Sequence, residues 1–442
     1  MDGVKQNPMW MTRRRLGALV GATGAAAAGS VLAACAGGEA TDGAPSANEQ
    51  PVQLTYLHQW SPTQGHGPIT DTLVARFKEQ NPTTQVEGVY SAEYYAKLSA
   101  MLAGGDFPDI VTYNLAQVPA LVKKGVVVPA ETLSKGSHRL NLGDLVPAAR
   151  DMATFDGKLA VAPYALNSSG LALNVNLFQQ KGVDAGKPPT TWNELLDVSR
   201  RITGMDNTGK EAWGTVFPRG TADAISPLLA FIWQNGGELV DMTKRTATWN
   251  SADAIEALAY QVDLVHRHRV APYPMPGNGE MGNVGIWHIP PGNVSALQIR
   301  IKDAFVWTTA ELPKGKRQAT TVGGHSLAVL KTNKHHERAW RFIHWYVTPA
   351  VNAEYLAATT TLPPWRASEQ HAAWQKYVKD EPRIQPFTRM LSYARPTPKL
   401  TRWEEIITIL AQARDAAAEQ KKTPKQALDD AAREAEPLIQ EG

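Results

Sequence analysis

The sequence alternates between β-rich runs and helical runs after its first fifty residues, and this alternation limits the fold more than any other feature. Residues 52–60 (VQLTYLHQW) favour a strand, and Ile69, Leu73 and Phe77 follow at helical spacing. The same order recurs in the strand-like runs 85–90 and 110–113 and in the helical runs 94–105 and 117–124. Repeated β-α-β units predict an α/β fold with a mainly parallel sheet covered by helices. Such sheets place binding sites at the carboxyl ends of their strands.

A second series of elements begins near residues 171–173. Thr191 and Glu194 have the spacing of a capping box, which predicts a helix from Trp192. Residues 273–292 are dense in Gly and Pro and predict an irregular loop. The tail predicts a helix over 403–420 and a shorter helix that is capped at Thr423, with Pro424 in its first turn.

Composition narrows the class of protein. A chain of 442 residues with 43% hydrophobic residues can form two or three domain-sized units. Four of its 45 Lys and Arg and one of its 42 Asp and Glu lie in residues 1–34, so the remaining 408 residues carry 41 of each and no net charge. A neutral body has no basic excess for nucleic acid or for an anionic membrane. The single cysteine excludes an intrachain disulfide and a cysteine-based zinc site.

The N-terminus has the features of an export signal. Arg13, Arg14 and Arg15 precede an uncharged run over residues 16–38. This run predicts a signal peptide over residues 1–34 that resembles twin-arginine export signals. Residues 32–35 (LAAC) resemble the lipobox of bacterial lipoproteins, in which the cysteine is acylated, for instance with palmitate. We therefore expect Cys35 to be the lipid anchor and residues 35–51 to be a flexible tether. A permanent transmembrane anchor is the alternative, although Gly and Ala dominate the run.

Several motifs resemble catalytic sites without the context that catalysis needs. Residues 277–282 match GxGxxG, but Pro274 and Pro276 precede them where a dinucleotide-binding strand would end. Ser326 lies in a partial nucleophile elbow, GHSLA, yet a strand-like run follows it instead of a helix. The pairs His266/His268 and His335/His336 lack metal-ligand spacing, and we expect them on solvated helix surfaces. Carboxylate pairs for glycoside hydrolysis stay open, because sequence does not give their separation.

Tryptophan is the strongest binding signal. Twelve of the 13 tryptophans follow the signal region, and Trp60 ends the first predicted strand. A tryptophan at a strand end offers a flat apolar face to the C–H face of a sugar ring, and nearby Asn, His and Arg can satisfy the hydroxyls. For Trp60 and Trp287 a ligand contact and a core position are about equally expected. Trp192, Trp340, Trp345 and Trp403 are on helical patterns, which favours core positions.

A set of short motifs resembles the extracellular solute-binding proteins of bacterial ABC importers, family 1. The motifs are FKEQNP (77–82), GGDFPDIV (104–111), DGKL (156–159), PY (163–164), LNVNLF (173–178), TWNEL (191–195), LPKG (312–315) and GG (323–324). The resemblance implies a two-lobed, periplasmic-binding-protein-like α/β fold of class II, with the ligand cleft between lobes joined by a hinge. It implies lobes of residues 52–162 with 322–360 and 163–321 with 361–442, and chain crossings near 162–164, 321–325 and 360–363.

The resemblance also implies a function and a site. It implies a substrate-binding lipoprotein that captures a mono- or oligosaccharide and delivers it to two permease subunits and their ATPase. The same fold also binds glycerophosphodiesters, which is the alternative; an exported glycosidase or esterase is a third. The implied ligand contacts are Trp60, Tyr113, Asn114, Gln117, Asn167, Trp233, Trp287, Gly324, His325 and Arg395. We expect a monomer outside the cytoplasm, with no catalysis, cofactor, metal or nucleic acid.

Overall fold

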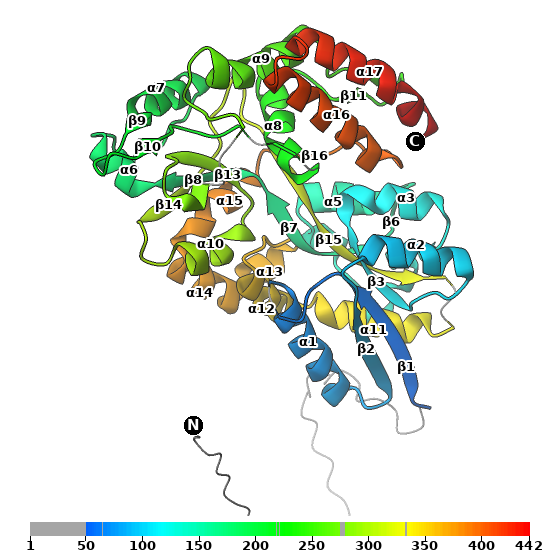
Figure 1. Cartoon of the computed structure of the whole chain (residues 1–442). Helices are drawn as coiled ribbons and strands as arrows, with labels where there is room; N and C mark the ends of the chain where they lie inside the picture. Colours follow the sequence, from blue (N-terminus) through cyan, green and yellow to red (C-terminus); the bar gives the residue numbers. More distant parts are fainter. Residues whose placement is uncertain (1–49, 64, 218, 221, 275–278, 332–333) are drawn as a thin grey trace, which may run out of the picture. The chain divides into compact units, whose positions relative to one another are not determined.

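The computed structural model describes residues 50–442 except 64, 218, 221, 275–278 and 332–333 (Figure 1). The predicted signal peptide, the lipidated Cys35 and the tether up to residue 49 lie outside the described residues. No helix in the described part of the chain is long and apolar enough to span a bilayer.

A seven-stranded sheet is the larger of the two main sheets. Its strands are β1 (Val52–His58), β2 (Thr84–Tyr90), β3 (Ile110–Asn114), β4 (Val127–Val128), β7 (Ala162–Ser168), β15 (Thr320–Leu330) and β16 (Ala394–Pro396). The order is β16-β15-β3-β1-β2, and β4 and β7 also pair with β15. β1 runs parallel to β2 and β3, but β15 runs antiparallel to β3, β4 and β7. The sheet was predicted to be mainly parallel. It is instead mixed, because β15 pairs antiparallel with three of the other strands.

The helices that accompany these strands in the sequence pack against this sheet or against one another. They are α1 (Gly67–Gln80), α2 (Tyr94–Gly104), α3 (Val118–Lys123), α4 (Ala130–Leu133), α5 (Pro147–Ala153), α11 (His336–Tyr346) and α12 (Pro349–Thr359). Phe77 of α1 meets Phe342 of α11 edge to face, with ring centroids 5.0 Å apart, and Phe342 also contacts Tyr56 of β1 at 5.6 Å. The predicted helical spacing of Leu73 and Phe77 is confirmed, since both are fully buried.

The second sheet has the order β13-β8-β14, with β13 (Ile286–Ile289), β8 (Gly170–Asn174) and β14 (Trp307–Ala310). Short hairpins pair β5 (Thr154–Phe155) with β6 (Lys158–Leu159), β9 (Gly204–Met205) with β10 (Glu211–Ala212), and β11 (Val240–Asp241) with β12 (Thr246–Ala247). β13 lies where an irregular loop was predicted, so that prediction was wrong for residues 286–289. Residues 286–289 form a strand because they pair with β8, although the surrounding Gly- and Pro-rich sequence does not favour one.

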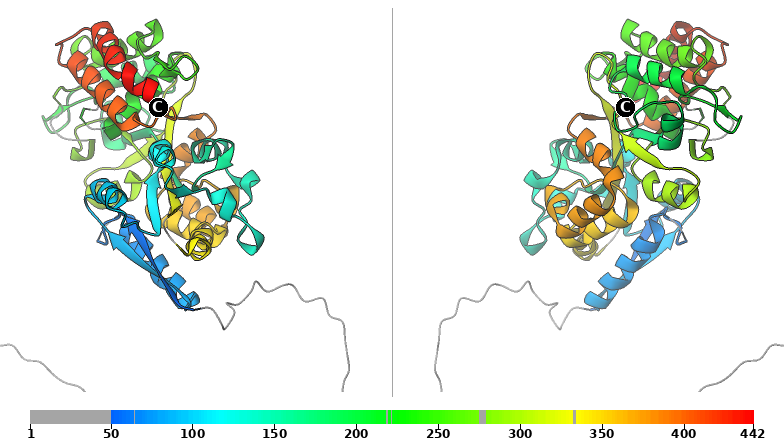
Figure 2. Two further views of the ribbon diagram at one scale, coloured as in Figure 1. Left: turned by 90° about the vertical axis from the view of Figure 1, so that its right-hand side faces the viewer. Right: turned by 90° about the vertical axis from the view of Figure 1, so that its left-hand side faces the viewer.

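The remaining helices pack mostly with the second sheet and with one another. They are α6 (Val175–Gln180), α7 (Trp192–Ile202), α8 (Ser226–Gln234), α9 (Ala252–His266), α10 (Asn293–Ile301), α13 (Arg366–Gln370), α14 (Ala372–Asp380), α15 (Gln385–Met390), α16 (Trp403–Ala418) and α17 (Pro424–Glu441). Single 3₁₀ turns are η1 (Leu115–Gln117), η2 (Gly136–His138), η3 (Leu142–Asp144), η4 (Ala222–Ile225), η5 (Gly279–Met281) and η6 (Pro382–Ile384). Figures 1 and 2 show the C-terminal helices α16 and α17 beside α8 and α9, which precede them by more than 130 residues.

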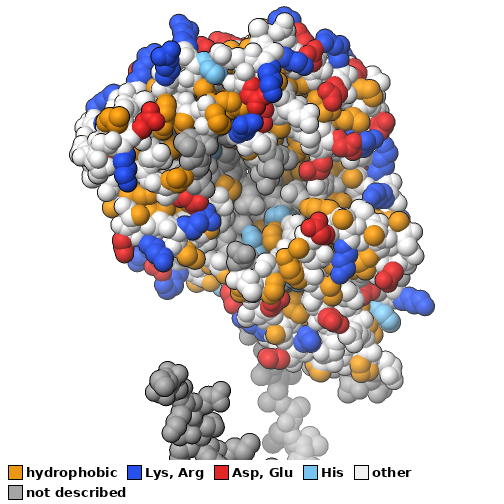
Figure 3. All heavy atoms as spheres, in the orientation of Figure 1, with side chains coloured by type: hydrophobic (Ala, Val, Ile, Leu, Met, Phe, Trp, Pro, Cys, Tyr) orange, Lys and Arg blue, Asp and Glu red, His pale blue; other side chains and the backbone are white. Residues whose placement is uncertain are grey.

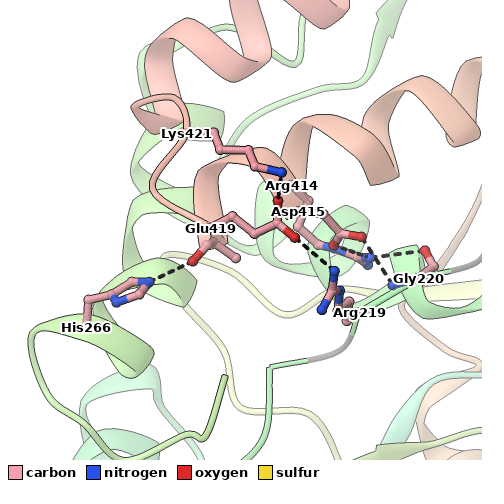
Figure 4. A network of polar contacts seen from close by, with 8 residues as sticks. Arg219, Gly220, His266, Arg414, Asp415, Glu419 and Lys421 are labelled. Atoms are coloured by element: carbon pink, nitrogen blue, oxygen red, sulfur yellow. Dashed lines mark hydrogen bonds and ion pairs between the residues drawn. The ribbon is translucent and has the colours of Figure 1, made fainter. Parts of the chain in front are cut away.

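The two C-terminal helices are held by side-chain caps and a buried ion pair. Thr423 and Gln426 form the full capping box, but α17 has 18 residues and is longer than α16, contrary to the prediction. Arg414 of α16 is 1% exposed and pairs with Asp415 at 2.8 Å. Its guanidinium also donates to the carbonyl oxygen of Gly220 at 3.2 Å (Figure 4) and to that of Ala224 at 2.6 Å. Arg414 thus fastens the chain before α8 to the C-terminal helices.

The three predicted chain crossings lie beside one another. β7 pairs with β15 from Ala162, which lies opposite Leu327, to Ser168, which lies opposite Val322. Leu166 of β7 exchanges two backbone hydrogen bonds of 2.8 Å with Leu362. The segments predicted to cross, near 162–164, 321–325 and 360–363, therefore form one hydrogen-bonded strip. The division of the chain into the two predicted lobes stays a prediction.

Candidate binding site along strand β15

A row of side chains lies along β15 and includes residues of the strands that pair with it. Thr321 pairs with Arg395 of β16, Gly323 with Asn167 of β7, and His325 with Asn114 of β3. Because strand side chains alternate between faces, residues 321, 323 and 325 share one face with their paired neighbours. β15 therefore brings together four of the predicted contacts, Asn114, Asn167, His325 and Arg395, from four distant stretches of sequence.

Trp60 packs into an aromatic cluster at the His325 end of this row. Its ring stacks on His66 with centroids 4.2 Å apart and meets His325 edge to face at 4.7 Å. The Trp60 Nε1–H donates to the phenolic oxygen of Tyr164 at 3.1 Å. A phenol–imidazole bond of 2.7 Å joins Tyr355 to His66 Nδ1. These five residues, Trp60, His66, Tyr164, His325 and Tyr355, are called the Trp60 cluster below.

Burial keeps the Trp60 cluster uncharged at neutral pH. It lowers the pKa of His66 to about 4 and, with the nearby His66 ring, the pKa of His325 to about 3. Burial also raises the pKa of Tyr164 to about 12, despite its hydrogen bonds. Nδ1 of His325 is buried and has no hydrogen-bond partner among the described residues. A neutral imidazole has one donor and one acceptor, so this nitrogen has an unused hydrogen-bonding capacity.

The residues that follow β3 continue the site. Asn114 accepts a hydrogen bond from the Ala116 N–H at 2.9 Å and caps η1, which fixes its side chain. The Oε1 of Gln117 is buried and lacks a partner within the described part of the chain. Tyr113 is half-buried and meets Tyr95 edge to face at 6.0 Å. All three predicted contacts here lie at the carboxyl end of β3, as expected.

Arg395 and Trp233 form a separate pair. The Arg395 guanidinium binds both carboxylate oxygens of Glu238, at 3.0 and 2.7 Å, and lies 4.9 Å from the centroid of the Trp233 ring. Trp233 is 2% exposed on α8. The predicted ligand role therefore fits Trp233 poorly, and the charge of Arg395 is already compensated by a carboxylate.

Trp287 and Gly324 have packing roles that differ from the predicted ligand contacts. Trp287 is 5% exposed in β13, meets Phe305 at 6.4 Å and lies directly under Gly279, where a Cβ would be 2.1 Å from its ring. At Gly324 a Cβ would lie 2.2 Å from the carbonyl oxygen of Ala165 in β7. Trp287 fills the core beneath η5, and Gly324 lets β15 and β7 approach each other.

Helix α10, which belongs with the second sheet, reaches the same face at its N-terminal end. A Cβ on Gly292 would lie 3.8 Å from the Asn167 side-chain oxygen, and Thr360 donates to the Pro291 carbonyl at 2.9 Å. Figure 3 shows one hollowed region of the surface, with histidine (pale blue) and hydrophobic (orange) side chains inside it. A small molecule here would contact both the seven-stranded sheet and the start of α10.

The serine and GxGxxG motifs lack the local geometry that their catalytic or cofactor roles need. Ser326 is fully buried in the middle of β15 and donates to the Tyr113 carbonyl at 3.1 Å, so it has no elbow geometry. Residues 279–281 of the GxGxxG match form a 3₁₀ turn that is followed by strand β13 instead of a helix, and residues 277–278 are outside the described part. His266 is not simply solvated, since its Nε2 lies 2.7 Å from the Ala418 carbonyl (Figure 4). Among the described residues, no group of three or more His, Cys, Asp or Glu could hold a metal ion.

Sequence reasoning missed three members of the Trp60 cluster. His66 and Tyr355 are 289 residues apart, and no periodicity connects them. Tyr164 appeared only as part of a motif, although its position beside a predicted crossing could have marked it. His66 follows Trp60 in the Gly- and Pro-containing segment before α1, and that segment after a strand end was the available signal.

Comparison with known proteins gives the class that this fold and site define. A family model described as bacterial extracellular solute-binding protein matches residues 72–382. The chain belongs to this family of solute-binding proteins and has its two-lobed α/β fold.

Among solved structures, the cyclic alpha-maltosyl-1,6-maltose binding protein of Arthrobacter globiformis has a TM-score of 0.78 and 25% identity, over 89% of this chain and 100% of that chain. UgpB of Mycobacterium tuberculosis, solved with glycerophosphocholine, has a TM-score of 0.75 and 19% identity, over 88% and 98%. The sn-glycerol-3-phosphate-binding periplasmic protein UgpB of Salmonella paratyphi A is 24% identical over 416 residues, which cover 88% of this chain and 94% of that protein.

Proposed function

We propose that this protein captures an uncharged mono- or oligosaccharide at the row along β15 and delivers it to an ABC importer. The observation that carries the proposal is the uncharged Trp60 cluster beside the side-chain amides of Asn114 and Asn167. Aromatic rings bind the C–H faces of sugars, and neutral donors and acceptors bind hydroxyls without the desolvation cost of an ion.

The hydrogen-bonding groups of the site match a polyol. The imidazole of His325 and the amides of Asn114 and Asn167 each offer both donor and acceptor atoms, as sugar hydroxyls do. A micromolar dissociation constant corresponds to about −8 kcal/mol, which one or two stacked rings and several hydrogen bonds can supply.

Capture is coupled to the hinge in this proposal. A sugar that contacts β15 and the start of α10 together stabilises the conformation in which the two are close. The hydrogen-bonded strip of β7, β15 and Leu362 supports a hinge at this place, since it joins all three chain crossings.

The partners of this activity lie at the membrane. We propose that two permease subunits and an ATPase receive the sugar, that the mature protein is a monomer outside the cytoplasm, and that acylated Cys35 anchors it to the cell membrane. Twin-arginine export and a tether over residues 35–51 complete this arrangement. The names of several similar structures support the importer, among them an ABC substrate-binding protein of Listeria monocytogenes in complex with cycloalternan. The site as proposed performs no covalent step.

A ligand screen tests the proposal. Thermal unfolding is measured with maltose, maltotriose, cellobiose, trehalose, sn-glycerol-3-phosphate and glycerophosphocholine, each at millimolar concentration. At least one sugar should raise the Tm, because a ligand that binds only the folded state stabilises it. No shift with any of the four sugars would count against carbohydrate binding.

A glycerophosphodiester is the second candidate, because proteins named UgpB resemble this chain over most of its length. A phosphate needs a cationic partner, and Arg395 is bound to Glu238 while both cluster histidines are held neutral by burial. Binding of glycerophosphocholine that weakens steeply with salt would favour this candidate over a sugar.

A further inference from the structure

We propose that Gly323 is the floor of the binding site and sets how closely a ligand ring approaches the β15 backbone. The proposal rests on the carbohydrate-binding function above and deepens it, because it names the ligand as a flat pyranose ring laid against bare backbone.

Adjacent glycines in β15 differ in what surrounds them. At Gly324 a Cβ would collide with the β7 backbone, at 2.2 Å from the Ala165 oxygen and 2.9 Å from Leu166 Cα. At Gly323 a Cβ would meet no atom of the described residues within 4 Å, and the backbone is not in the left-handed region. Packing therefore explains Gly324 and does not explain Gly323.

A glycine inside a strand has a cost. It weakens the strand by about 0.5–1 kcal/mol relative to alanine, because the unfolded chain loses more freedom and no side chain packs. Such a glycine commonly marks close approach by another backbone or by a ligand. No atom of the described residues lies within 4 Å of a Cβ built on Gly323, so there is room for a ligand to approach the backbone here.

The surroundings of Gly323 match a ring-shaped polyol. Asn167 of β7 lies opposite Gly323 in the sheet. Thr321 and His325 lie two residues before and after Gly323 on the same face of β15, each about 7 Å away along the strand. The position is half-buried, as expected for the floor of a hollow. A flat ring resting there would have its hydroxyl rim beside Asn167 and His325, whereas a bulky branched head group would be held away from the backbone.

The test adds a side chain at this place and at a matched control. Gly323→Ala and Gly323→Leu fill the open space in two steps. Gly104→Leu adds the same side chain at the end of α2, where a Cβ also meets nothing among the described atoms within 4 Å and the backbone is likewise outside the left-handed region. Tm without ligand and calorimetric Kd values for maltose, maltotriose, cellobiose and trehalose are measured for each protein.

The proposal predicts opposite effects on folding and on binding. Gly323→Leu should keep or raise the Tm and weaken the tightest-binding sugar at least tenfold, Gly323→Ala should weaken it less, and Gly104→Leu should leave it within twofold. Gly323→Leu binding within twofold of the parent overturns the role of Gly323. A parent that binds none of the four sugars instead overturns the proposed function, so the two failures are distinguishable.

Thiol labelling gives a readout that does not depend on the folding of the leucine variant. In full-length Cys35→Ser protein, Gly323→Cys provides the only thiol. It should react readily with iodoacetamide and be protected by the sugar that binds, whereas Ser326→Cys, at a fully buried position, should react slowly. Slow labelling of Gly323→Cys, or labelling unaffected by bound sugar, would overturn the proposal.

Discussion

Replacement of Trp60 by alanine should weaken sugar binding much more than it weakens the fold. The side chain is half-buried, with one contact to His66 at 4.2 Å, one to His325 at 4.7 Å and one hydrogen bond to Tyr164. Loss of a stacked sugar ring removes the apolar contact and the ring-specific term, together about 1–3 kcal/mol of binding free energy. This range corresponds to a rise in Kd of roughly 5- to 150-fold.

Trp287→Ala is the matched control, because both variants lose an indole ring from the same protein. Trp287 is packed against Phe305 and under Gly279, so its loss should cost about 3–5 kcal/mol of unfolding free energy as for other buried aromatic residues. The folded fraction should still bind sugar within about threefold of the parent.

The assay is titration calorimetry with the sugar that gives the largest thermal shift, together with urea unfolding of each variant. Trp60→Phe should fall between the parent and Trp60→Ala, since it keeps a ring and loses the bond to Tyr164. If Trp60→Ala bound within twofold of the parent while folded Trp287→Ala lost binding, the placement of the stacking surface would be refuted.

Three further outcomes follow from the structure. Gly324→Ala should lower the unfolding free energy in urea by about 1–3 kcal/mol, because its Cβ would push β15 from Ala165; an unchanged midpoint would contradict the close approach. Burial lowers the pKa of His66 to about 4, so between pH 6.5 and 4 the unfolded chain binds a proton that the folded protein does not; the unfolding free energy should fall over this window, and less steeply in His66→Gln. Chromogenic p-nitrophenyl glycosides and esters should stay uncleaved, and product release that Ser326→Ala abolishes would establish an enzyme.

The sequence predicted the fold class well because the signals for it are local. Leu73 and Phe77 at helical spacing and the cap at Thr423 each depend on a few neighbouring residues. The antiparallel path of β15 and the strand at 286–289 depend on pairing partners more than 100 residues away. No local pattern contains that information.

The candidate site was predicted in part for the same reason. Trp60 and His325 were predicted from a strand end and from a glycine motif, and the structure brings their rings together. Trp287 has a similar local context, and only the position of Gly279 above its ring reveals that it is buried; its predicted ligand contact stays a prediction. Gly323 was noticed only as part of a motif, since the difference between two adjacent glycines is visible only from what surrounds them.

The central claim is that the site along β15 binds an uncharged sugar beside the uncharged Trp60 cluster. Calorimetry of the parent protein with the four sugars and with glycerophosphocholine, at 20 mM and 500 mM salt, tests it most directly. We expect at least one sugar to bind with a Kd that salt changes by less than twofold, because no ion pair forms. Tight, salt-sensitive binding of glycerophosphocholine with no binding of any sugar would contradict the account.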